Sequence, residues 1–308
     1  MGDGEKTATA GSPRGSEKTA TAGSPRGSEK TVGLLHPGEM GSAVGRCLAG
    51  AGHKVLWAGT GRSPDTAARA QAAGLADAGQ VAALAARAGV VLSICPPHAA
   101  VEVARQVAAA GFSGLYVDAN AIAPGTAATV AAVAEAGGAS YVDGGIIGPP
   151  PDAPDRTRLY LSGARAAAAA ALFAGTWVDA RVVDGRVGAA SAVKLAYAAW
   201  TKGSAALLLA AEALASAAGV HDALLAEWDI SQPGLERRRA GAARSAAVKG
   251  WRWDAEMEEI ADSMAAAGLP DGFHRAAAEI FRRPPRHTSG DSVTVSDVIA
   301  ALLPDRDA

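Results

Sequence analysis

The 308-residue chain has only 2 cysteines, few aromatic residues (5%) and a formal net charge of just −2 at pH 7. Cys47 and Cys95 lie far apart and form no CxxC pair, so neither a disulfide framework nor a zinc site is predicted. The near-neutral charge gives no electrostatic basis for binding nucleic acid or an anionic membrane. No apolar run is long enough for a membrane span. We therefore expect a cytoplasmic protein with no metal, nucleic-acid or membrane partner.

Apolar residues, mostly small ones, make up nearly half of the chain. Hydrophobic residues account for 49% of the sequence, and most of them are Ala, Val and Leu. This composition is typical of tightly packed helices lying on a sheet. The length allows two domains, or one large one, with a sizeable core.

The first 30 residues contain an exact repeat. Residues 6–17, KTATAGSPRGSE, recur without change as residues 18–29. Two copies are too few for a solenoid, and the unit has no large apolar residue with which to build a core. It also lacks the apolar region of a secretory signal. We expect residues 1–30 to form a disordered repeat tail, with a linker or partner-binding role as the alternative.

From residue 31, short apolar runs alternate with Ala-rich stretches. The runs predict strands at 32–35, 54–58, 90–94, 115–118 and 140–143. The stretches between and beside them predict helices at 41–51, 63–73, 80–88, 99–109 and 124–136. This alternation is typical of the α/β class and predicts a Rossmann-type doubly wound parallel sheet with helices on both faces. A ligand would bind outside the carboxyl ends of its strands.

The alternation ends at the proline-rich residues 149–154. A short hairpin-like pair is expected at 158–161 and 181–183, extending the sheet. Residues 188–218 predict one apolar helix of about 46 Å, buried against other helices or another subunit. The predicted organisation is a nucleotide-binding domain at 31–187, an all-α helical domain for substrate and dimerisation at 188–283, and a mobile tail at 284–308.

The turn after the first strand resembles a dinucleotide fingerprint. Residues 36–41 read HPGEMG, so His36 replaces the first glycine of G-x-G-x-x-G. A helix follows at once, and its start offers free N–H groups and a positive dipole end to a pyrophosphate. Pro37 has no N–H, so the donors must come from the residues after it. We assign phosphate contacts to Gly38, Glu39, Met40 and Gly41.

The end of the second strand favours NADP(H) over NAD(H). An acidic residue there would accept from a ribose hydroxyl, but this chain has no carboxylate until Asp65. Arg62 can grip a 2′-phosphate, and Ser63 adds a donor. The alternative is a solvated arginine in a loop. At the end of the strand at 90–94, Cys95 and Pro96 are expected near the nicotinamide ribose, and nothing marks Cys95 as a nucleophile.

Three segments, 33–41 (GLLHPGEMG), 118–124 (DANAIAP) and 188–194 (GAASAVK), appear in the order found in β-hydroxyacid dehydrogenases. The chain thus resembles the 6-phosphogluconate dehydrogenase superfamily, which also includes the imine reductases. Residues 251–260 and 268–274 look like the helical domain of its phosphogluconate dehydrogenase-like branch. The resemblance covers about residues 31–283.

The resemblance assigns Lys194 as the catalytic acid/base. Hydride transfer to a carbonyl creates an alkoxide, which needs a proton donor and a positive neighbour. A partly buried lysine has a lowered pKa and can serve as both. On a helix, Tyr197 and Thr201 share the face of Lys194, and Lys202 lies one position away. The alternative is a lysine that extends its ammonium group from an apolar helix into water.

The departures from the family pattern concern the substrate. Asn120 replaces the family's hydroxyl residue but can still donate and accept hydrogen bonds. The usual Ser-Gly-Gly corresponds to residues 147–149, in which Gly148 alone is retained, and Tyr197 stands where an asparagine is usual. A small β-hydroxyacid therefore becomes doubtful, and a larger or less acidic carbonyl, or an imine, becomes credible. Substrate contacts are assigned to Gly148, Lys202 and His274.

The sequence thus predicts an NADPH-dependent reductase in which Lys194 protonates a carbonyl oxygen, assisted by Tyr197 or Asn120. One alternative is an imine reductase that uses Tyr197, and a second is a dinucleotide-binding sensor without turnover. The apolar helix at 188–218, together with the resemblance, predicts a homodimer. Glu256, Glu258 and Glu259 are expected on a solvated helix face rather than at a metal.

Overall fold

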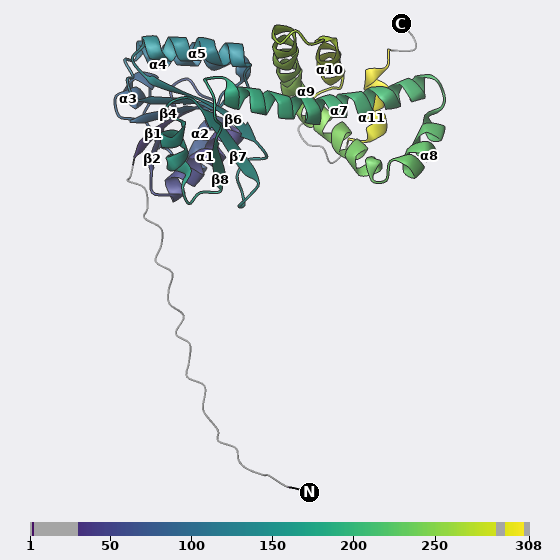
Figure 1. The fold of residues 1–308 in the computed structure, drawn as a ribbon, viewed down its shortest axis with the longest axis horizontal. Coiled ribbons are helices and arrows are strands. Elements are labelled where there is room, and N and C mark those ends of the chain that lie inside the picture. The colour runs from purple at the N-terminus through teal and green to yellow at the C-terminus, as the bar shows by residue number, and fades with distance from the viewer. Residues whose placement is uncertain (1, 3–29, 288–292, 305–308) are drawn as a thin grey trace.

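The structure is a computed structural model that describes residues 2, 30–287 and 293–304. Nearly all of the predicted repeat tail lies outside these residues. An eight-stranded sheet with flanking helices is followed by an all-helical region (Figure 1). Within the described residues, no helix combines the length and hydropathy that crossing a bilayer would require.

The first six strands are all parallel and lie in the order β3-β2-β1-β4-β5-β6. This order confirms the predicted Rossmann-type sheet, whose strand order reverses between β1 and β4. The two-residue β3 was not predicted, because both of its residues are exposed and carry no apolar pattern. The bounds are β1 (Thr31–Leu35), β2 (Lys54–Trp57), β3 (Ala76–Asp77), β4 (Val90–Ser93), β5 (Leu115–Asp118) and β6 (Ser140–Ile147).

The last two strands correct the expected hairpin. β7 (Thr157–Ser162) pairs antiparallel with β6, but β8 (Val178–Val182) runs parallel to β7. Parallel neighbours need a crossover, which α6 (Ala166–Ala170) and η2 (Ala171–Phe173) provide. This crossover was not predicted from the sequence, and its Leu172 and Phe173 are buried against the sheet.

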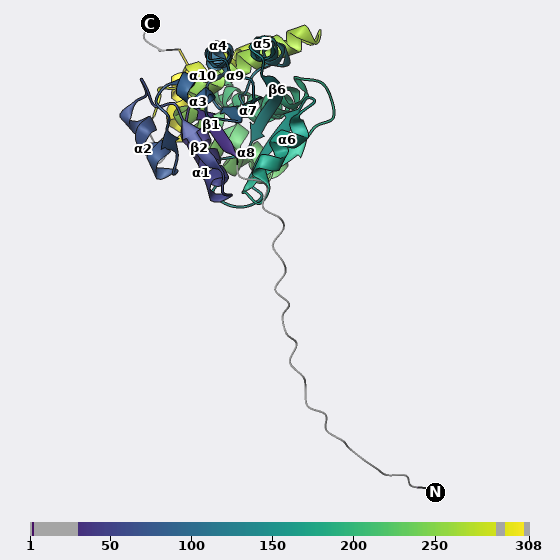
Figure 2. The ribbon, with the colours of Figure 1, turned by 90° about the vertical axis from the view of Figure 1, so that its left-hand side faces the viewer.

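Helices cover both faces of the sheet. In Figure 2, α4 and α5 lie above the sheet and α1 lies below it. Two separate apolar cores result, because α1, α2 and α6 pack on one face and α3, α4 and α5 on the other. The bounds are α1 (Glu39–Gly50), α2 (Pro64–Ala72), α3 (Val81–Ala85), η1 (Pro97–Ala99), α4 (Ala100–Ala109) and α5 (Pro124–Ala136).

The helical region has its own core, and α7 joins it to the sheet (Figure 1). The long predicted helix is present as α7 (Ala189–Ala217). The other helices are α8 (His221–Ser231), α9 (Leu235–Ala266), α10 (Gly272–Arg282) and α11 (Val295–Leu302). The expected tail at 284–308 is wrong at α11, because Val298, Ile299 and Leu302 are buried in this core. Thr294 and Asp297 form the capping box that begins the helix.

Candidate active site

A buried carboxylate on β6 holds the start of α7. Asp143 accepts hydrogen bonds from the backbone N–H groups of Gly188 and Ser191, both at 3.0 Å, and from the hydroxyl groups of Ser162 and Ser191. These bonds satisfy helix-end donors that would otherwise lack partners. Sequence reasoning placed Asp143 at a strand end and missed this role. The contact fixes the first turn of α7, which precedes Lys194.

Lys194 lies where α7 crosses β6. A Cβ atom at Gly145 would lie 2.7 Å from Lys194 Cβ and 3.0 Å from the carbonyl oxygen of Ala190. Only glycine therefore lets the helix approach the strand this closely. Burial lowers the pKa of Lys194, and the nearby Tyr197 opposes that shift. The crossing buries the lysine stem while holding its ammonium group in one place.

Glu256 on α9 bridges Lys194 and Lys202. Its Oε1 lies 3.3 Å from Lys194 Nζ, and its Oε2 contacts Lys202 Nζ. Side-chain exposure is 16% for Lys194, 15% for Lys202 and 9% for Glu256. Burial, reinforced by the charges of Lys194, Arg252 and Lys249, lowers the pKa of Lys202 to about 6. The expectation of a solvated face is thus wrong for Glu256.

The other two glutamates of that segment have separate roles. Glu259 accepts a 2.8 Å hydrogen bond from the N–H of Ala123 and so ties the start of α5 to α9. Glu258 forms ion pairs with Arg275 and Arg282 and is partly exposed. Three neighbouring carboxylates therefore face three directions. Among the residues described, no group of three or more His, Cys, Asp and Glu side chains is placed to hold a metal ion.

The turn between β1 and α1 has the geometry of a phosphate site. His36 adopts φ 65°, the left-handed conformation that a glycine would adopt more easily. A Cβ atom at Gly41 would lie 2.6 Å from the His36 carbonyl oxygen, so Gly41 cannot carry a side chain. The backbone N–H of Ser42 donates to the Gly38 carbonyl oxygen at 2.9 Å, which is the first hydrogen bond of the helix. The N–H groups of residues 39–41 come before that bond and therefore fit a pyrophosphate.

Arg62 lies near this turn. The burial of His36, together with the positive charge of Arg62, lowers the pKa of His36 to about 4. His36 is therefore neutral at physiological pH, and it does not repel Arg62. The Ser63 hydroxyl caps α2, accepting from the Thr66 N–H at 3.3 Å, so part of its hydrogen-bonding capacity is already used. Asp77, at the end of β3, accepts from the N–H groups of Gly59 and Gly79 and orders the same loop.

Asn120 ties together the ends of β4 and β5. Its Oδ1 accepts from the N–H of Cys95, and its Nδ2 donates to Ser93 Oγ at 3.3 Å. The amide is buried and occupied by these contacts, so it orders the strand ends. Burial raises the pKa of the Cys95 thiol to about 12, which makes it a poor nucleophile. Pro96 precedes η1 at the same edge.

The predicted substrate residues are differently placed. Lys202 belongs to the buried cluster described above. Gly148 has φ 118° in the turn after β6, where a Cβ atom would overlap the Arg156 carbonyl oxygen. His274 is buried on α10 against Gly203, with its Nε2 3.4 Å from the Ala199 carbonyl oxygen. Lys202 is therefore close to Lys194. Gly148 is required by its backbone conformation, and His274 packs between helices α10 and α7.

Helix α9 contacts both the lysine cluster (Lys194, Lys202 and Glu256) and the helix that follows the β1–α1 turn at residues 36–41, here called the phosphate turn. Arg252 lies 3.6 Å from Glu39, the first residue of α1, and α9 also contacts η1. Glu256 is one turn further along α9. The helix that carries the carboxylate partner of Lys194 therefore also contacts the segments that follow β1 and β4.

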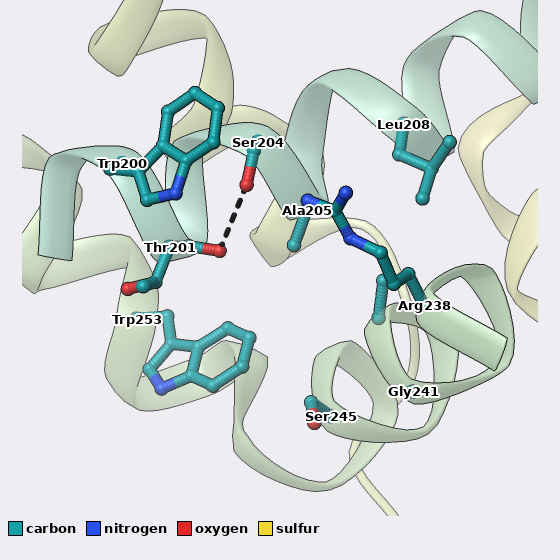
Figure 3. Close-up of a pocket in the computed structure, with 10 residues that line it drawn as sticks. Trp200, Thr201, Ser204, Ala205, Leu208, Arg238, Gly241, Ser245 and Trp253 are labelled. Atoms are coloured by element: carbon teal, nitrogen blue, oxygen red, sulfur yellow. Dashed lines mark hydrogen bonds between the residues drawn. The ribbon is translucent and has the colours of Figure 1, made fainter. Parts of the chain in front are cut away.

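A cavity of about 300 Å³ lies between α7 and α9 beside this cluster (Figure 3). Trp253 forms part of its wall, and Lys202 Nζ lies 5.1 Å from the centroid of that ring. The two tryptophans, the hydroxyl groups and one arginine give it a mixed surface. Its wall is formed by Trp200, Thr201, Ser204, Ala205, Leu208, Arg238, Gly241, Ala242, Ser245 and Trp253.

Comparison with known proteins agrees with this architecture. Residues 31–174 match the NAD binding domain of 6-phosphogluconate dehydrogenase, and residues 215–283 match a domain of unknown function, DUF1932. None of the curated proteins matches the chain significantly.

Three solved structures are similar over nearly the whole chain. A conserved protein of unknown function, described as structurally similar to 3-hydroxyacid dehydrogenases, is 25% identical (TM-score 0.65), with 89% of this chain and 100% of that chain covered. The Mycobacterium tuberculosis 3-hydroxyisobutyrate dehydrogenase with L-serine is 21% identical (TM-score 0.62; coverage 89% and 99%). An Aspergillus terreus reductive aminase in complex with NADPH4, cyclohexanone and allyl amine is 22% identical (TM-score 0.53; coverage 89% and 99%).

The sheet, its phosphate turn and the matched nucleotide domain define an NAD(P)-dependent oxidoreductase. The two matched domains together place the chain in the 6-phosphogluconate dehydrogenase-like superfamily.

Proposed function

We propose that the chain reduces a carbonyl compound with NADPH and that Lys194 is the general acid. The observation that carries this proposal is the burial of Lys194 at the crossing of α7 and β6, where its ammonium group contacts one carboxylate. The fold shared with the hydroxyisobutyrate dehydrogenase supports it.

The chain's residues can supply what carbonyl reduction needs. NADPH, when bound, supplies the hydride. The Lys194 ammonium group gives its proton to the carbonyl oxygen, and its charge stabilises the developing alkoxide. Tyr197 is 46% exposed and lies three residues further along α7, so its hydroxyl group is available as a second donor. The amide of Asn120 acts indirectly, by holding the strand ends in place.

An imine reductase that uses Tyr197 is the second candidate. The exposed Tyr197 hydroxyl group and the structural similarity to the reductive aminase favour it. The buried lysine cluster counts against it, because an ammonium group repels a developing iminium ion. A sensor without turnover is the third candidate.

The assay that decides among these is a screen of NADPH oxidation with ketones, semialdehydes and cyclic imines. Our proposal predicts turnover of a ketone or semialdehyde and none of the imines. Turnover confined to imines would establish the reductase of C=N bonds instead. Tight binding of NADPH without oxidation of any compound would favour the sensor.

Arg62 is proposed to select NADPH by contacting the 2′-phosphate. Arg62→Ala should weaken NADPH binding about 10–100-fold, because charge-assisted hydrogen bonds contribute about 1.5–3 kcal/mol. NADH binding should change little, since NADH lacks that phosphate. Fluorescence titration of both cofactors measures the effect, with Arg105→Ala, on the exposed surface of α4, as the matched control. An equal loss for NADH would argue against this role.

We also propose a homodimer formed through α7 and α8. Trp200, Leu207, Leu214 and Ile230 are large apolar side chains exposed on these two helices. A second copy of the same face would cover them. Light scattering should give twice the 30.6 kDa mass of the chain, and a monomer would contradict the proposal.

A further inference from the structure

Lys194, Glu256 and Lys202 form a buried cluster in which two amines share one carboxylate. We propose that Glu256 is a positioning residue that keeps Lys194 protonated, and that Lys202, when it gains a proton, competes for the same carboxylate. This inference rests on the proposed role of Lys194 as general acid. It adds that Glu256, a residue to which the sequence assigns no such role, sets the protonation state of Lys194.

The burial of the cluster makes the carboxylate decisive. Each of the three side chains is at most 16% exposed, so water solvates their charges poorly. A buried ammonium group without a counter-ion tends to lose its proton. Glu256 reaches both amines, one through each carboxylate oxygen, yet it carries only one negative charge. It can therefore fully neutralise only one of the two lysines at a time.

Burial and the surrounding charges make Lys202 a weak base. Burial is the main cause of the fall of its pKa to about 6, and the positive charges of Lys194 on the same helix and of Arg252 and Lys249 on α9 add to it. The Trp253 ring beside it offers a partial cation–π contact. The pKa of Lys202 therefore lies well below that of an ordinary lysine, so a second positive charge beside Glu256 is disfavoured.

The other titratable groups around α7 are already engaged or distant. Asp143 on β6 accepts bonds at the start of α7, and His274 on α10 lies against Gly203. Arg252 is paired in part with Glu39. Tyr197 is the remaining neighbour that favours the charged form of Lys194. Glu256 is therefore the carboxylate that contacts Lys194 among the described residues.

Two substitutions should shift the pKa values of the two lysines in opposite directions. Glu256→Gln removes the counter-ion while keeping the shape, so the pKa of Lys194 should fall by about 1 unit or more. Lys194→Met removes the competing charge, so the pKa of Lys202 should rise by about 1 unit or more. A merely structural cluster would lose stability without either of these shifts.

Competitive labelling of the full-length protein with acetic anhydride, read by mass spectrometry across pH, gives both lysine pKa values without any need for turnover. With a substrate from the screen, the high-pH limb of kcat/KM for Glu256→Gln should move to lower pH by the same amount. Glu258→Gln, a partly exposed neighbour on α9, is the matched control and should shift neither value.

Unchanged labelling of Lys194 in Glu256→Gln, or of Lys202 in Lys194→Met, would overturn the inference. If Glu256→Gln fails to fold, Lys194→Met still tests the sharing of the carboxylate. Labelling shifts in a protein that oxidises NADPH with no compound would uphold the cluster and remove the proposed function. Turnover without the shifts in labelling would uphold the proposed function and remove the role given to Glu256.

Discussion

Lys194→Met should lower kcat by about 10²–10⁴-fold, the usual contribution of a positioned general acid. The substitution removes both the proton donor and the positive charge beside the developing alkoxide. NADPH affinity should stay nearly constant, because the phosphate turn and Arg62 lie on β1–α1 and β2–α2 rather than on α7. Stopped-flow hydride transfer and a fluorescence titration of NADPH separate these two effects.

The pH dependence should have a definite direction. Lys194 must be protonated to act as an acid, so the rate is expected to fall as the pH rises through its pKa. Burial lowers that pKa, so the fall should begin below the range of an ordinary lysine. Lys54→Met, at the exposed start of β2, should leave the profile unchanged. A fully active Lys194→Met enzyme would exclude Lys194 from the reaction.

The sheet could be predicted from sequence because its signals are local. The strand at 115–118 and the helix at 124–136 have the predicted bounds, since an apolar run and a proline at the helix start specify them. The parallel arrangement of β7 and β8 could not be predicted in this way. Its crossover uses a helix of only five residues, too short for a periodic pattern.

The site could be predicted only in part, because its partners come from distant segments. Lys194 stands out as a charge in an apolar stretch. Glu256 looks like one of three clustered glutamates on a charged helix, and its burial depends on how α9 packs on α7. A usable signal was present, since Trp253 and Ile260 lie three and four residues away on the same helical stripe. A glutamate on such a stripe predicts a buried partner.

The phosphate turn could also be predicted only in part from the sequence. The sequence predicts its glycines and the lack of an N–H at Pro37. It does not predict that His36 adopts the left-handed conformation of the missing glycine, because that choice depends on the chain around it. The same packing lowers the pKa of His36, which allows Arg62 to lie close by without repulsion.

Asp143→Ala should lower the free energy of unfolding by about 3–5 kcal/mol, because hydrogen bonds to a charged group contribute about 1.5–3 kcal/mol each and several are lost at once. The carboxylate is fully buried and accepts from Gly188, Ser191 and Ser162. Alanine leaves these donors without an acceptor and without water. Asp143→Asn should also destabilise the fold, because its amide nitrogen would face N–H and O–H donors. Urea denaturation measures both changes.

Asp152→Ala is the matched control, since Asp152 is exposed and pairs with Arg156 on the surface. Its effect should stay within about 1 kcal/mol, as for other exposed ion pairs. Asp143 also fixes the turn of α7 that precedes Lys194, so the loss of stability should come with a fall in kcat. A variant that unfolds like the wild type would show that α7 is held by its apolar contacts alone. A destabilised variant with full kcat would show that the position of Lys194 depends on Gly145 and Glu256 instead.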